Sequence, residues 1–381
     1  MRIGIDARLW QESGVGRYIR NLVNGLLILD DKNEYVLFVD SQNCQKLKAQ
    51  SSKLKAQIKN GKWKLVATEI RWHTIEEQIK LSKILNNEKL DLMHFPYFSV
   101  PIFYNKPFVV TIHDLIIYHY PTGKASTLPL PLYQLKHQAY KYIISKAAKK
   151  AKKIIAPLEC TKKDIIKTLN IAQEKVDVTY EGFDNNIQQK NIDFSIKNSI
   201  ENVKYLLYVG NAYPHKNLEK LIEAFLEYKK EKNDNNVKLL LVGKEDYFYK
   251  QLEQKIKRNP DIEILHNIDD NNLSYLYQNA VALVAPSLME GFGLTALEAM
   301  FNSCLVLASD IPSFKEICGE AAIYFDPKNT EDIKEKIKKV YNLDTQKRKE
   351  YILKEKKRIS AFSWDKMVKK TLKIYEDCNS V

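Results

Sequence analysis

The feature that most constrains the fold of this chain is a regular alternation of short apolar runs with longer amphipathic segments. In the first half the runs are RIGID (2–6), YVLFV (35–39), WKLVA (63–67), DLMHF (91–95), PFVVTIH (107–113), KKIIA (152–156) and VDVTY (176–180). Helical periodicity marks residues 15–29 and about 128–150 between them. Runs that are apolar on both faces and separated by helices are typical of a parallel sheet covered on both sides. The first half therefore predicts a doubly wound α/β domain.

A second series of the same kind follows a polar interruption. Residues 184–203 have no sustained apolar period, which predicts an interdomain linker. The later runs are YLLYV (205–209), VKLLLV (237–242), IEIL (262–265), VALVA (281–285), CLVLA (304–308) and AAIYF (321–325). At 381 residues the chain exceeds the size at which one core keeps growing. We predict an α/β protein with two doubly wound, Rossmann-like parallel sheets facing a cleft, over residues 1–190 and 200–360.

The loop after the run at 281–285 carries the most specific chemistry. Ligands of doubly wound sheets bind outside the carboxyl ends of the strands, so Glu290 is predicted to lie at the ligand edge. The residues that lead into the next helix are Gly291, Phe292, Gly293 and Leu294. Backbone N–H groups at a helix start suit a phosphate, and glycines let it approach the main chain. Glu298 follows eight positions later, and two such carboxylates can accept hydrogen bonds from a sugar and a ribose of one extended ligand. The simpler alternative is a helix cap and a surface glutamate.

These residues resemble the E-x7-E signature of retaining glycosyltransferases of family 4, which have the GT-B fold. Four further stretches resemble the family in the same order: SGVGRY (13–18), TIHD (111–114), YVGNAYPHKNLEKLIEAF (208–225) and DIPSFKEICGEAAIYFDP (310–327). The resemblance covers nearly the whole chain. It implies that Glu290 holds the hydroxyls of the donor sugar, that Glu298 holds the ribose, and that Lys216 neutralises the donor diphosphate.

Lys216 also fits this role by its position. It follows an apolar run at the predicted ligand edge and is predicted to open a helix, so its ammonium and the helix start can address the same anion. The alternative is an ordinary solvated lysine. The chain departs from the family at Asn211 and His215, where many members have an arginine. Both residues are kept as donor-binding candidates, with His215 as a replacement for the missing diphosphate contact.

The first half supplies a second group of candidates. Gly14 and Gly16 lie between the first predicted strand and helix, and the resemblance implies that they face the donor phosphate and the reacting sugar, with Arg17 as an anion contact. Turn geometry is the alternative, and the third glycine of a dinucleotide fingerprint is missing. His113 ends the run at 107–113, and the resemblance implies that it contacts the donor. Asp114 is predicted either to orient this imidazole or to bind acceptor.

The net charge, the N-terminal sequence and the cysteines indicate the partners and the cellular compartment to expect. Sixty Lys and Arg against 47 Asp and Glu give a net charge of +13, which favours an anionic partner. The start of the chain lacks the features of a signal peptide, and five scattered cysteines fit reduced thiols, so we expect a cytoplasmic protein. Residues 135–153 are predicted to form a basic helix with Tyr140, Ile143, Ile144, Ala147 and Ala151 along its apolar side. This helix suits peripheral contact with an anionic membrane, or it is an ordinary domain helix with a solvated lysine face. The resemblance implies that a final helix, 362–381, packs back on the first domain.

Together these observations predict a retaining hexosyltransferase. It would move a hexose from a GDP- or UDP-linked donor to a glycan or lipid-linked acceptor, as in cell-surface polysaccharide assembly. Glu290, His113 and Lys216 are the predicted catalytic residues, and we expect neither a cofactor nor a metal, since no Asp-x-Asp signature occurs at the donor site. Two alternatives remain: a nucleotide-sugar epimerase or hydrolase of the same fold, and a basic nucleic-acid-binding protein. The second lacks a recognised nucleic-acid motif, so nucleic acid is not an expected partner.

Overall fold

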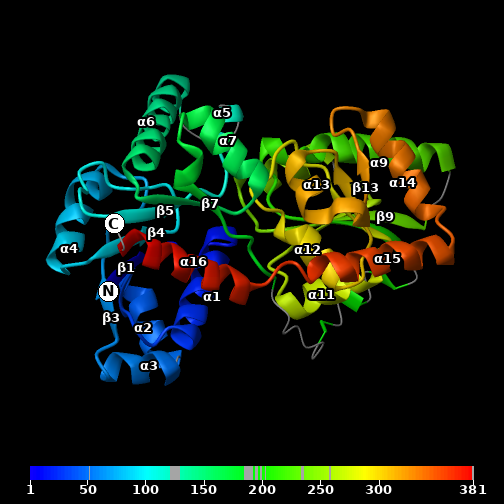
Figure 1. Ribbon diagram of the computed structural model, residues 1–381. Helices are drawn as coiled ribbons and strands as arrows, with labels where there is room; N and C mark the ends of the chain where they lie inside the picture. Colours follow the sequence, from blue (N-terminus) through cyan, green and yellow to red (C-terminus); the bar gives the residue numbers. More distant parts are fainter. Residues whose placement is uncertain are drawn as a thin grey trace. The chain divides into compact units, whose positions relative to one another are not determined.

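The computed structural model describes residues 1–50, 52–120, 129–183, 192–193, 196–197, 200–201, 203–232, 236–256 and 259–379. The chain divides into two compact units (Figure 1). Among the described residues, unit 1 consists of 1–120, 129–182 and 363–379, and unit 2 consists of those within 183–362. Most of the linker predicted at 184–203 lies outside the described residues.

Unit 1 is built on a seven-stranded parallel sheet with the order β3-β2-β1-β4-β5-β6-β7. Its strands are β1 Arg2–Asp6, β2 Glu34–Val39, β3 Trp63–Ala67, β4 Leu92–Phe95, β5 Phe108–Thr111, β6 Lys153–Ala156 and β7 Val176–Val178. Its helices are α1 Gly14–Leu29, α2 Ser41–Gln50, α3 Ser52–Lys59, the π-helix η1 Glu77–Leu81, α4 Ser82–Asn87, α5 Ile116–His119, α6 Leu130–Lys150, α7 Glu159–Leu169, the 3-10 turn η3 Gln173–Lys175 and α16 Trp364–Asn379.

The sheet of unit 1 has apolar layers on both faces. On β2, Val36 and Phe38 join the core formed with α4, α6 and α7, whereas Leu37 and Val39 join the core formed with α1 and α16. Alternate strand residues point to opposite faces, which is why these runs are apolar throughout. Helix α16 contributes Met367, Val368 and Tyr375 to the second core, and it packs on α1.

Unit 2 is built on a six-stranded parallel sheet with the order β10-β9-β8-β11-β12-β13. Its strands are β8 Lys204–Val209, β9 Val237–Gly243, β10 Ile262–His266, β11 Ala282–Ala285, β12 Val306–Ser309 and β13 Ala322–Phe325. Its helices are the 3-10 turn η4 Pro214–Lys216, α9 Leu218–Lys232, α10 Tyr247–Ile256, α11 Asp270–Asn279, α12 Leu294–Phe301, α13 Pro312–Cys318, the 3-10 turn η5 Gly319–Ala321, α14 Thr330–Tyr341 and α15 Thr345–Ile359.

The predicted α/β class with two parallel sheets is confirmed. Helices α9 and α14 pack together on a core that includes Phe225 and Ile337, and α12 packs on α13 and α15. The observed elements differ from the predicted ones mainly at their ends. The run at 304–308 forms a strand only from Val306, because Ser303 has a φ of 57° and turns the chain just before it. The five cysteines are free thiols.

Candidate functional site

The order of the second sheet places two predicted donor-binding residues together. The chain order reverses between β8 and β11, which are neighbouring strands, and such a switch point opens a crevice at the carboxyl ends of the strands. Lys216 lies in the connection that follows β8, and Glu290 lies in the loop that follows β11. The fold therefore brings together two residues that are 74 positions apart.

Lys216 and Glu290 form a direct ion pair. The Lys216 Nζ donates to Glu290 Oε1 at 2.7 Å and to Oε2 at 2.8 Å. The side chains are only 17% and 13% exposed, so solvent screens the pair weakly. Ser287, which the sequence did not single out, donates from Oγ to Glu290 Oε1 at 2.6 Å. Three donor–acceptor contacts thus fix the direction of one carboxylate.

The surroundings favour the ionised form of Glu290. Burial alone raises the pKa of a carboxyl group, but the Lys216 charge and the hydrogen bonds from Lys216 and Ser287 outweigh it and hold the pKa of Glu290 below its usual value. Glu290 is therefore an anion at neutral pH. It can accept hydrogen bonds from hydroxyl groups, but it has no proton to give as a general acid.

The turn that carries Lys216 is held by Asn217. Lys216 ends the short η4 turn and does not open α9, which begins at Leu218. Asn217 has a left-handed backbone with φ 59°, a conformation that asparagine tolerates better than most residues. Its Nδ2 donates to the carbonyls of Pro286 at 3.1 Å and Pro327 at 2.7 Å. Asn217 thus ties the lysine turn to the segments after β11 and β13.

His215 and Asn211 lie in the same connection with different surroundings. Burial, and then the nearby Lys216 charge, lower the pKa of His215 to about 4. The imidazole is therefore neutral at pH 7 and can offer a hydrogen bond but no positive charge to a diphosphate. The backbone carbonyl of Asn211 accepts a hydrogen bond from the Tyr208 hydroxyl at 2.6 Å. The side-chain Oδ1 of Asn211 accepts from the Tyr213 N–H at 3.3 Å. Asn211 thus stabilises the connection that leads to Lys216.

The glycine segment opens α12 as the sequence predicted. Gly293 precedes Leu294, the first residue of α12, and has φ 93°, which disfavours any side chain. Gly291 is partly exposed, whereas Phe292 is buried and packs edge-on against Phe362, with ring centroids 5.9 Å apart. The helix start is thus anchored by an aromatic contact.

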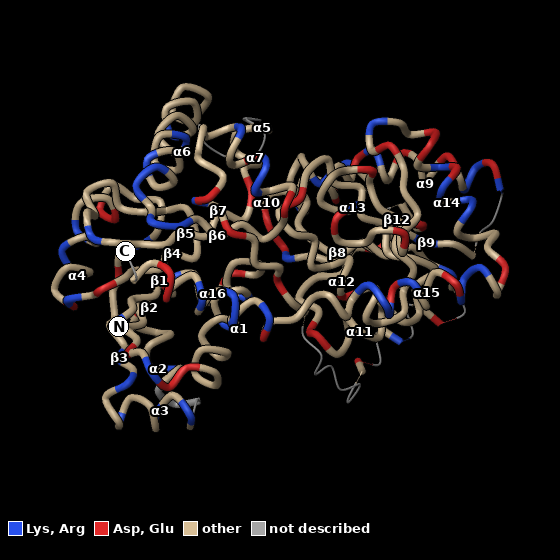
Figure 2. Tube along the Cα trace, viewed as in Figure 1, with Lys and Arg blue, Asp and Glu red and all other residues tan. Residues whose placement is uncertain are grey.

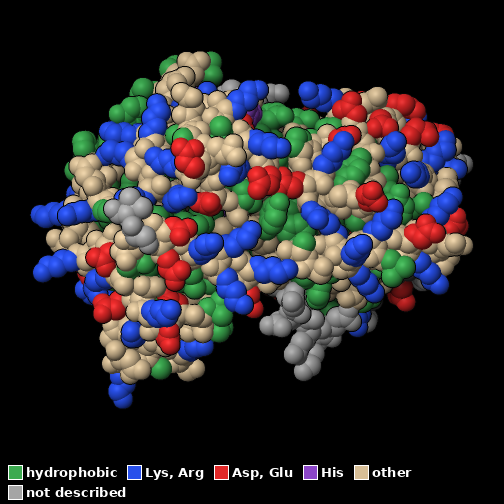
Figure 3. All heavy atoms as spheres, viewed as in Figure 1, with side chains coloured by type: hydrophobic (Ala, Val, Ile, Leu, Met, Phe, Trp, Pro, Cys, Tyr) green, Lys and Arg blue, Asp and Glu red, His purple; other side chains and the backbone are tan. Residues whose placement is uncertain are grey.

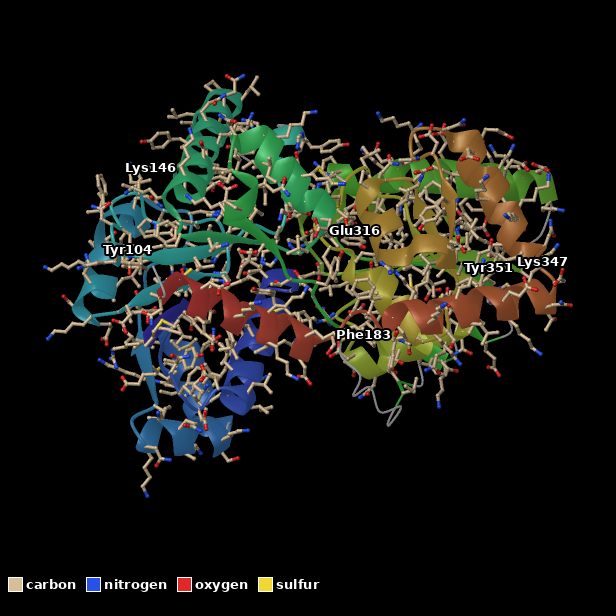
Figure 4. All side chains as sticks on the ribbon, viewed as in Figure 1. Tyr104, Lys146, Phe183, Glu316, Lys347 and Tyr351 are labelled. Atoms are coloured by element: carbon tan, nitrogen blue, oxygen red, sulfur yellow. The ribbon has the colours of Figure 1, made fainter. Side chains whose placement is uncertain are left out.

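Glu298 lies one turn into α12. Its Oε2 accepts a hydrogen bond from the Tyr277 hydroxyl of α11 at 3.1 Å. At the far end of the same helix, the ring of Phe301 packs against Phe183, the first residue of unit 2, at 5.1 Å between centroids (Figure 4). Helix α12 is therefore held at both ends by aromatic pairs within unit 2.

In unit 1, His113 is held through both ring nitrogens. Nε2 lies 2.9 Å from the Pro96 carbonyl and Nδ1 lies 3.0 Å from Glu181 Oε1. A carbonyl and a carboxylate only accept, so both nitrogens carry hydrogen and the imidazole is cationic. Burial lowers the pKa of His113, but the hydrogen bond and charge of Glu181 outweigh burial, and the pKa is raised above 6.5. The contact with a donor sugar remains a prediction. Glu181 was missed because it is 68 residues away from His113 in the sequence.

The remaining candidates of unit 1 differ in their surroundings. A Cβ on Gly16 would lie 2.8 Å from the carbonyls of Leu9 and Trp10, so this glycine is needed for packing inside the unit. Nothing lies within 4 Å of the equivalent point on Gly14, which borders open space. Arg17 is half-buried in the first turn of α1. Asp114 lies two residues before α5 and accepts from the N–H of Ile116, the first residue of that helix, at 2.9 Å.

Helix α6 corrects one part of the sequence interpretation. Ile144, Ala147 and Ala151, predicted to lie on the membrane-facing side, pack in the core of unit 1, because α6 covers one face of its sheet. Lysine positions lie along the helix (Figure 2), and Lys146 Nζ lies 5.5 Å from the centroid of the Tyr142 ring. The exposed apolar residues of α6 are instead Leu130, Leu132, Leu135 and Tyr142.

Among the described residues, no group of three or more His, Cys, Asp or Glu side chains is placed to hold a metal ion. None of the described helices combines the length and apolar character that a membrane crossing needs. On the face drawn in Figure 3, basic and acidic side chains are interspersed.

Two Rossmann-like parallel sheets are the architecture of the GT-B class of glycosyltransferases. The chain belongs to glycosyltransferase family 4. Residues 13–186 match the family model described as Glycosyltransferase Family 4, and residues 189–358 match the model described as Glycosyl transferases group 1.

Individual relatives agree with this assignment. The chain is 28% identical over 274 residues to the O-antigen chain mannosyltransferase RfbU of Salmonella typhimurium, covering 71% of each chain. It is 25% identical over 337 residues to the O-antigen chain mannosyltransferase B of Escherichia coli, covering 84% of this chain and 85% of the relative. Among solved structures, Anabaena HepE in complex with UDP-glucose shares the fold, with a TM-score of 0.71, 16% identity, and coverage of 99% and 100% of the two chains.

Proposed function

We propose that this chain is a retaining hexosyltransferase that moves mannose from a nucleotide diphosphate donor, GDP-mannose, to a glycan or lipid-linked acceptor in cell-surface polysaccharide assembly. The observation that carries the proposal is the Lys216–Glu290 pair at the switch point of the second sheet. The choice of mannose rests on the two mannosyltransferase relatives, which the chain matches over most of their length. A UDP-linked hexose is the alternative donor.

In the proposed reaction, unit 2 binds the donor. The diphosphate oxygens compete with Glu290 for the Lys216 ammonium, which stabilises the negative charge that grows on the leaving group. Glu290 then accepts hydrogen bonds from sugar hydroxyls, and Glu298 accepts from the ribose. The start of α12 adds backbone N–H donors near the phosphates. We propose that this arrangement works without a metal or another cofactor, so activity should survive chelation by EDTA.

The acceptor hydroxyl attacks the anomeric carbon on the face from which the diphosphate leaves. The bond from the anomeric carbon to the phosphate oxygen breaks as the new glycosidic bond forms, and the hydroxyl proton passes to a diphosphate oxygen. The configuration at the anomeric carbon is thereby kept. His113 is cationic and fixed by Glu181 and Pro96, so its proposed role is that of a positive group and not that of a base.

The function is tested with GDP-mannose, UDP-glucose and an α-mannoside acceptor. Glu290→Gln keeps the shape but loses the negative charge, and it should lower transfer by on the order of 10²-fold if that charge stabilises the developing cationic sugar. Incubation with GDP-mannose alone tests for a hydrolase or epimerase through released mannose or a new sugar isomer. Near-normal transfer by the variant would remove Glu290 from the site.

We also propose that the protein works at the cytoplasmic face of the membrane, bound through the exposed part of α6. Leu132 and Leu135 are 55% and 70% exposed, and the same helix carries Lys136 and Lys141. An apolar surface flanked by lysines suits an anionic lipid surface. This surface replaces the one predicted from the sequence, whose apolar residues are in the core.

A further inference from the structure

The switch point of the first sheet carries a group of side chains that the proposed function has not used. Chain order reverses between the neighbouring strands β1 and β4, so a ligand crevice is expected where their following loops meet. Arg8 follows β1, Tyr97 and Phe98 follow β4, and Trp72 and His73 follow β3. All of them belong to unit 1.

A buried network of ion pairs and hydrogen bonds connects these loops. Glu77, at the start of the π-helix η1, is fully buried and accepts from Arg8 Nη2 at 2.6 Å and from Ser99 Oγ at 2.6 Å. Arg8 also donates to Asp6 and to the Ile70 carbonyl. A buried ion pair whose remaining donors and acceptors are satisfied resists displacement. The network therefore fixes the loops after β1, β3 and β4 relative to one another.

His73 is presented on this network in a strained conformation. Its φ is 60°, which is uncommon outside glycine, and its backbone N–H donates to Glu77 at 2.9 Å. Such strain persists where surrounding contacts over-determine it, and it clusters at functional sites. The His73 Nε2 is buried and has no hydrogen-bond partner among the described residues. This nitrogen is therefore a buried polar atom whose hydrogen-bonding capacity is unused among the described residues.

Aromatic rings surround the His73 imidazole. The ring centroids lie 4.8 Å away for Trp72, 4.6 Å for Tyr140, 5.6 Å for Tyr97 and 5.6 Å for Phe98. Trp72 is 38% exposed, and Tyr97 and Tyr140 are partly exposed, so the group reaches the surface. Arg8 beneath it is matched by Asp6 and Glu77 and offers no uncompensated charge to a phosphate.

We propose that this aromatic cluster, Trp72, His73, Tyr97, Phe98 and Tyr140, binds a saccharide ring of the acceptor. A pyranose has an apolar C–H face that packs on aromatic rings and a rim of hydroxyls that donate to a buried acceptor nitrogen, which matches flat rings around His73 Nε2. Diphosphate binding, in contrast, needs a cation that a phosphate can reach: the Lys216 side chain of the second sheet is 17% exposed and has one carboxylate partner, whereas the Arg8 side chain is 4% exposed and has two. The inference rests on the proposed function, because it assigns the acceptor side of that reaction.

Direct binding of α-mannotriose to the full chain tests the inference without any need for turnover. Saturation-transfer NMR and calorimetry should show saturable binding to the wild type, about tenfold weaker binding to Trp72→Ala, and near-normal binding to Trp72→Phe, which keeps a flat ring. The matched control is Tyr247→Ala, which removes an exposed aromatic ring from unit 2 and should leave trisaccharide binding unchanged.

GDP affinity is measured on the same variants. Unchanged GDP binding by Trp72→Ala shows that the protein is folded and that the cluster does not hold the nucleotide. Absence of saturable trisaccharide binding to the wild type, equal trisaccharide binding by wild type and Trp72→Ala, or weaker GDP binding by Trp72→Ala would each overturn the inference. Failure of the proposed function looks different, because GDP-mannose is then not consumed whether or not the trisaccharide binds.

Discussion

At the scale of single residues, the Lys216 ammonium and the Glu290 carboxylate neutralise each other. In the proposed reaction a diphosphate gains the lysine only by separating the two, and part of its binding free energy is spent on that exchange. The exchange leaves Glu290 with free acceptor positions at the moment the donor is bound. A sugar whose hydroxyls fill those positions is favoured over one whose hydroxyls do not, which links diphosphate binding to recognition of the sugar.

The role of Lys216 is tested by Lys216→Ala. The variant should bind GDP more weakly by about 1.5 to 3 kcal/mol, the usual contribution of a hydrogen bond to a charged group. Isothermal titration calorimetry measures the difference, and Lys255→Ala, which removes an exposed lysine paired with Glu219, is the control. Equal GDP affinity in wild type and Lys216→Ala would rule out the proposed contact.

The His113–Glu181 pair predicts a pH dependence of stability. Because the folded state raises the pKa of His113, the pair stabilises the fold fully below the unfolded pKa of about 6.5, and this contribution is lost as pH rises through the folded pKa. Glu181→Gln should therefore be destabilising mainly at acidic pH. Urea unfolding from pH 5 to pH 9 should show the gap between wild type and variant shrinking as pH rises.

NMR titration of the histidine Cε1 protons should show a lower pKa for His113 in Glu181→Gln than in the wild type. An exposed carboxylate changed in the same way, Glu350→Gln, is the control. A stability gap that stays constant with pH would show that the pair does not titrate as described.

Residue-level prediction from sequence succeeded where a local pattern carried the information. Lys216 and Glu290 each follow an apolar strand run, and their common edge follows from strand order, so their proximity could be anticipated. Glu181 and Ser287 could not be found in this way. Their roles depend on side-chain directions, and Glu181, which contacts His113, is 68 residues away from it in the sequence, where no pattern marks it.

At the scale of elements, strand and helix positions were largely predictable because buried parallel strands leave continuous apolar runs. The ends were not. The strand predicted over 107–113 is ordered as a strand only over Phe108–Thr111, since Pro107 has no N–H to donate and His113 is held by side-chain contacts. The surface that the apolar side of α6 contacts was also ambiguous from the sequence. A lysine-rich helix with a row of alanines can pack that side on a sheet or on a membrane, and in the structure it packs in the core of unit 1.

The start of α16 packs on the last residue of the preceding part of unit 1. A Cβ on Gly182 would lie 2.2 Å from the backbone nitrogen of Trp364, an approach that only glycine allows. Gly182→Ala should therefore displace α16 and destabilise the protein by about 1 to 3 kcal/mol, as overpacking does. Thermal and urea unfolding measure this change. Gly14→Ala, where the added Cβ meets nothing within 4 Å, should change stability far less, and equal effects would contradict the packing argument.

At the scale of the whole molecule, the net charge of +13 and the exposed leucines of α6 predict binding to anionic membranes. The protein should co-sediment with vesicles that contain phosphatidylglycerol and much less with pure phosphatidylcholine vesicles. Binding should fall as salt rises, because screening shortens the reach of the lysines to about 8 Å at physiological ionic strength.

Leu135→Ser should weaken vesicle binding, since it removes apolar surface from the contact. Leu353→Ser is the matched control, because Leu353 is similarly exposed, at 66%, but lies on α15 in unit 2. Equal losses in the two variants, or binding that does not depend on lipid charge, would contradict a contact through α6.

The division of the chain also has a consequence for its synthesis on the ribosome. Among the described residues, unit 2 lies between Phe183 and Phe362, whereas unit 1 is completed only by α16, which is translated after it. At about 5 to 20 residues per second, translation of unit 2 takes on the order of ten to forty seconds. During that time the first 182 residues lack Met367, Val368 and Tyr375, so the part of the apolar layer that α16 covers stays open. The first unit to begin is thus the last to close, and its nascent form is the stage at which a chaperone is most needed.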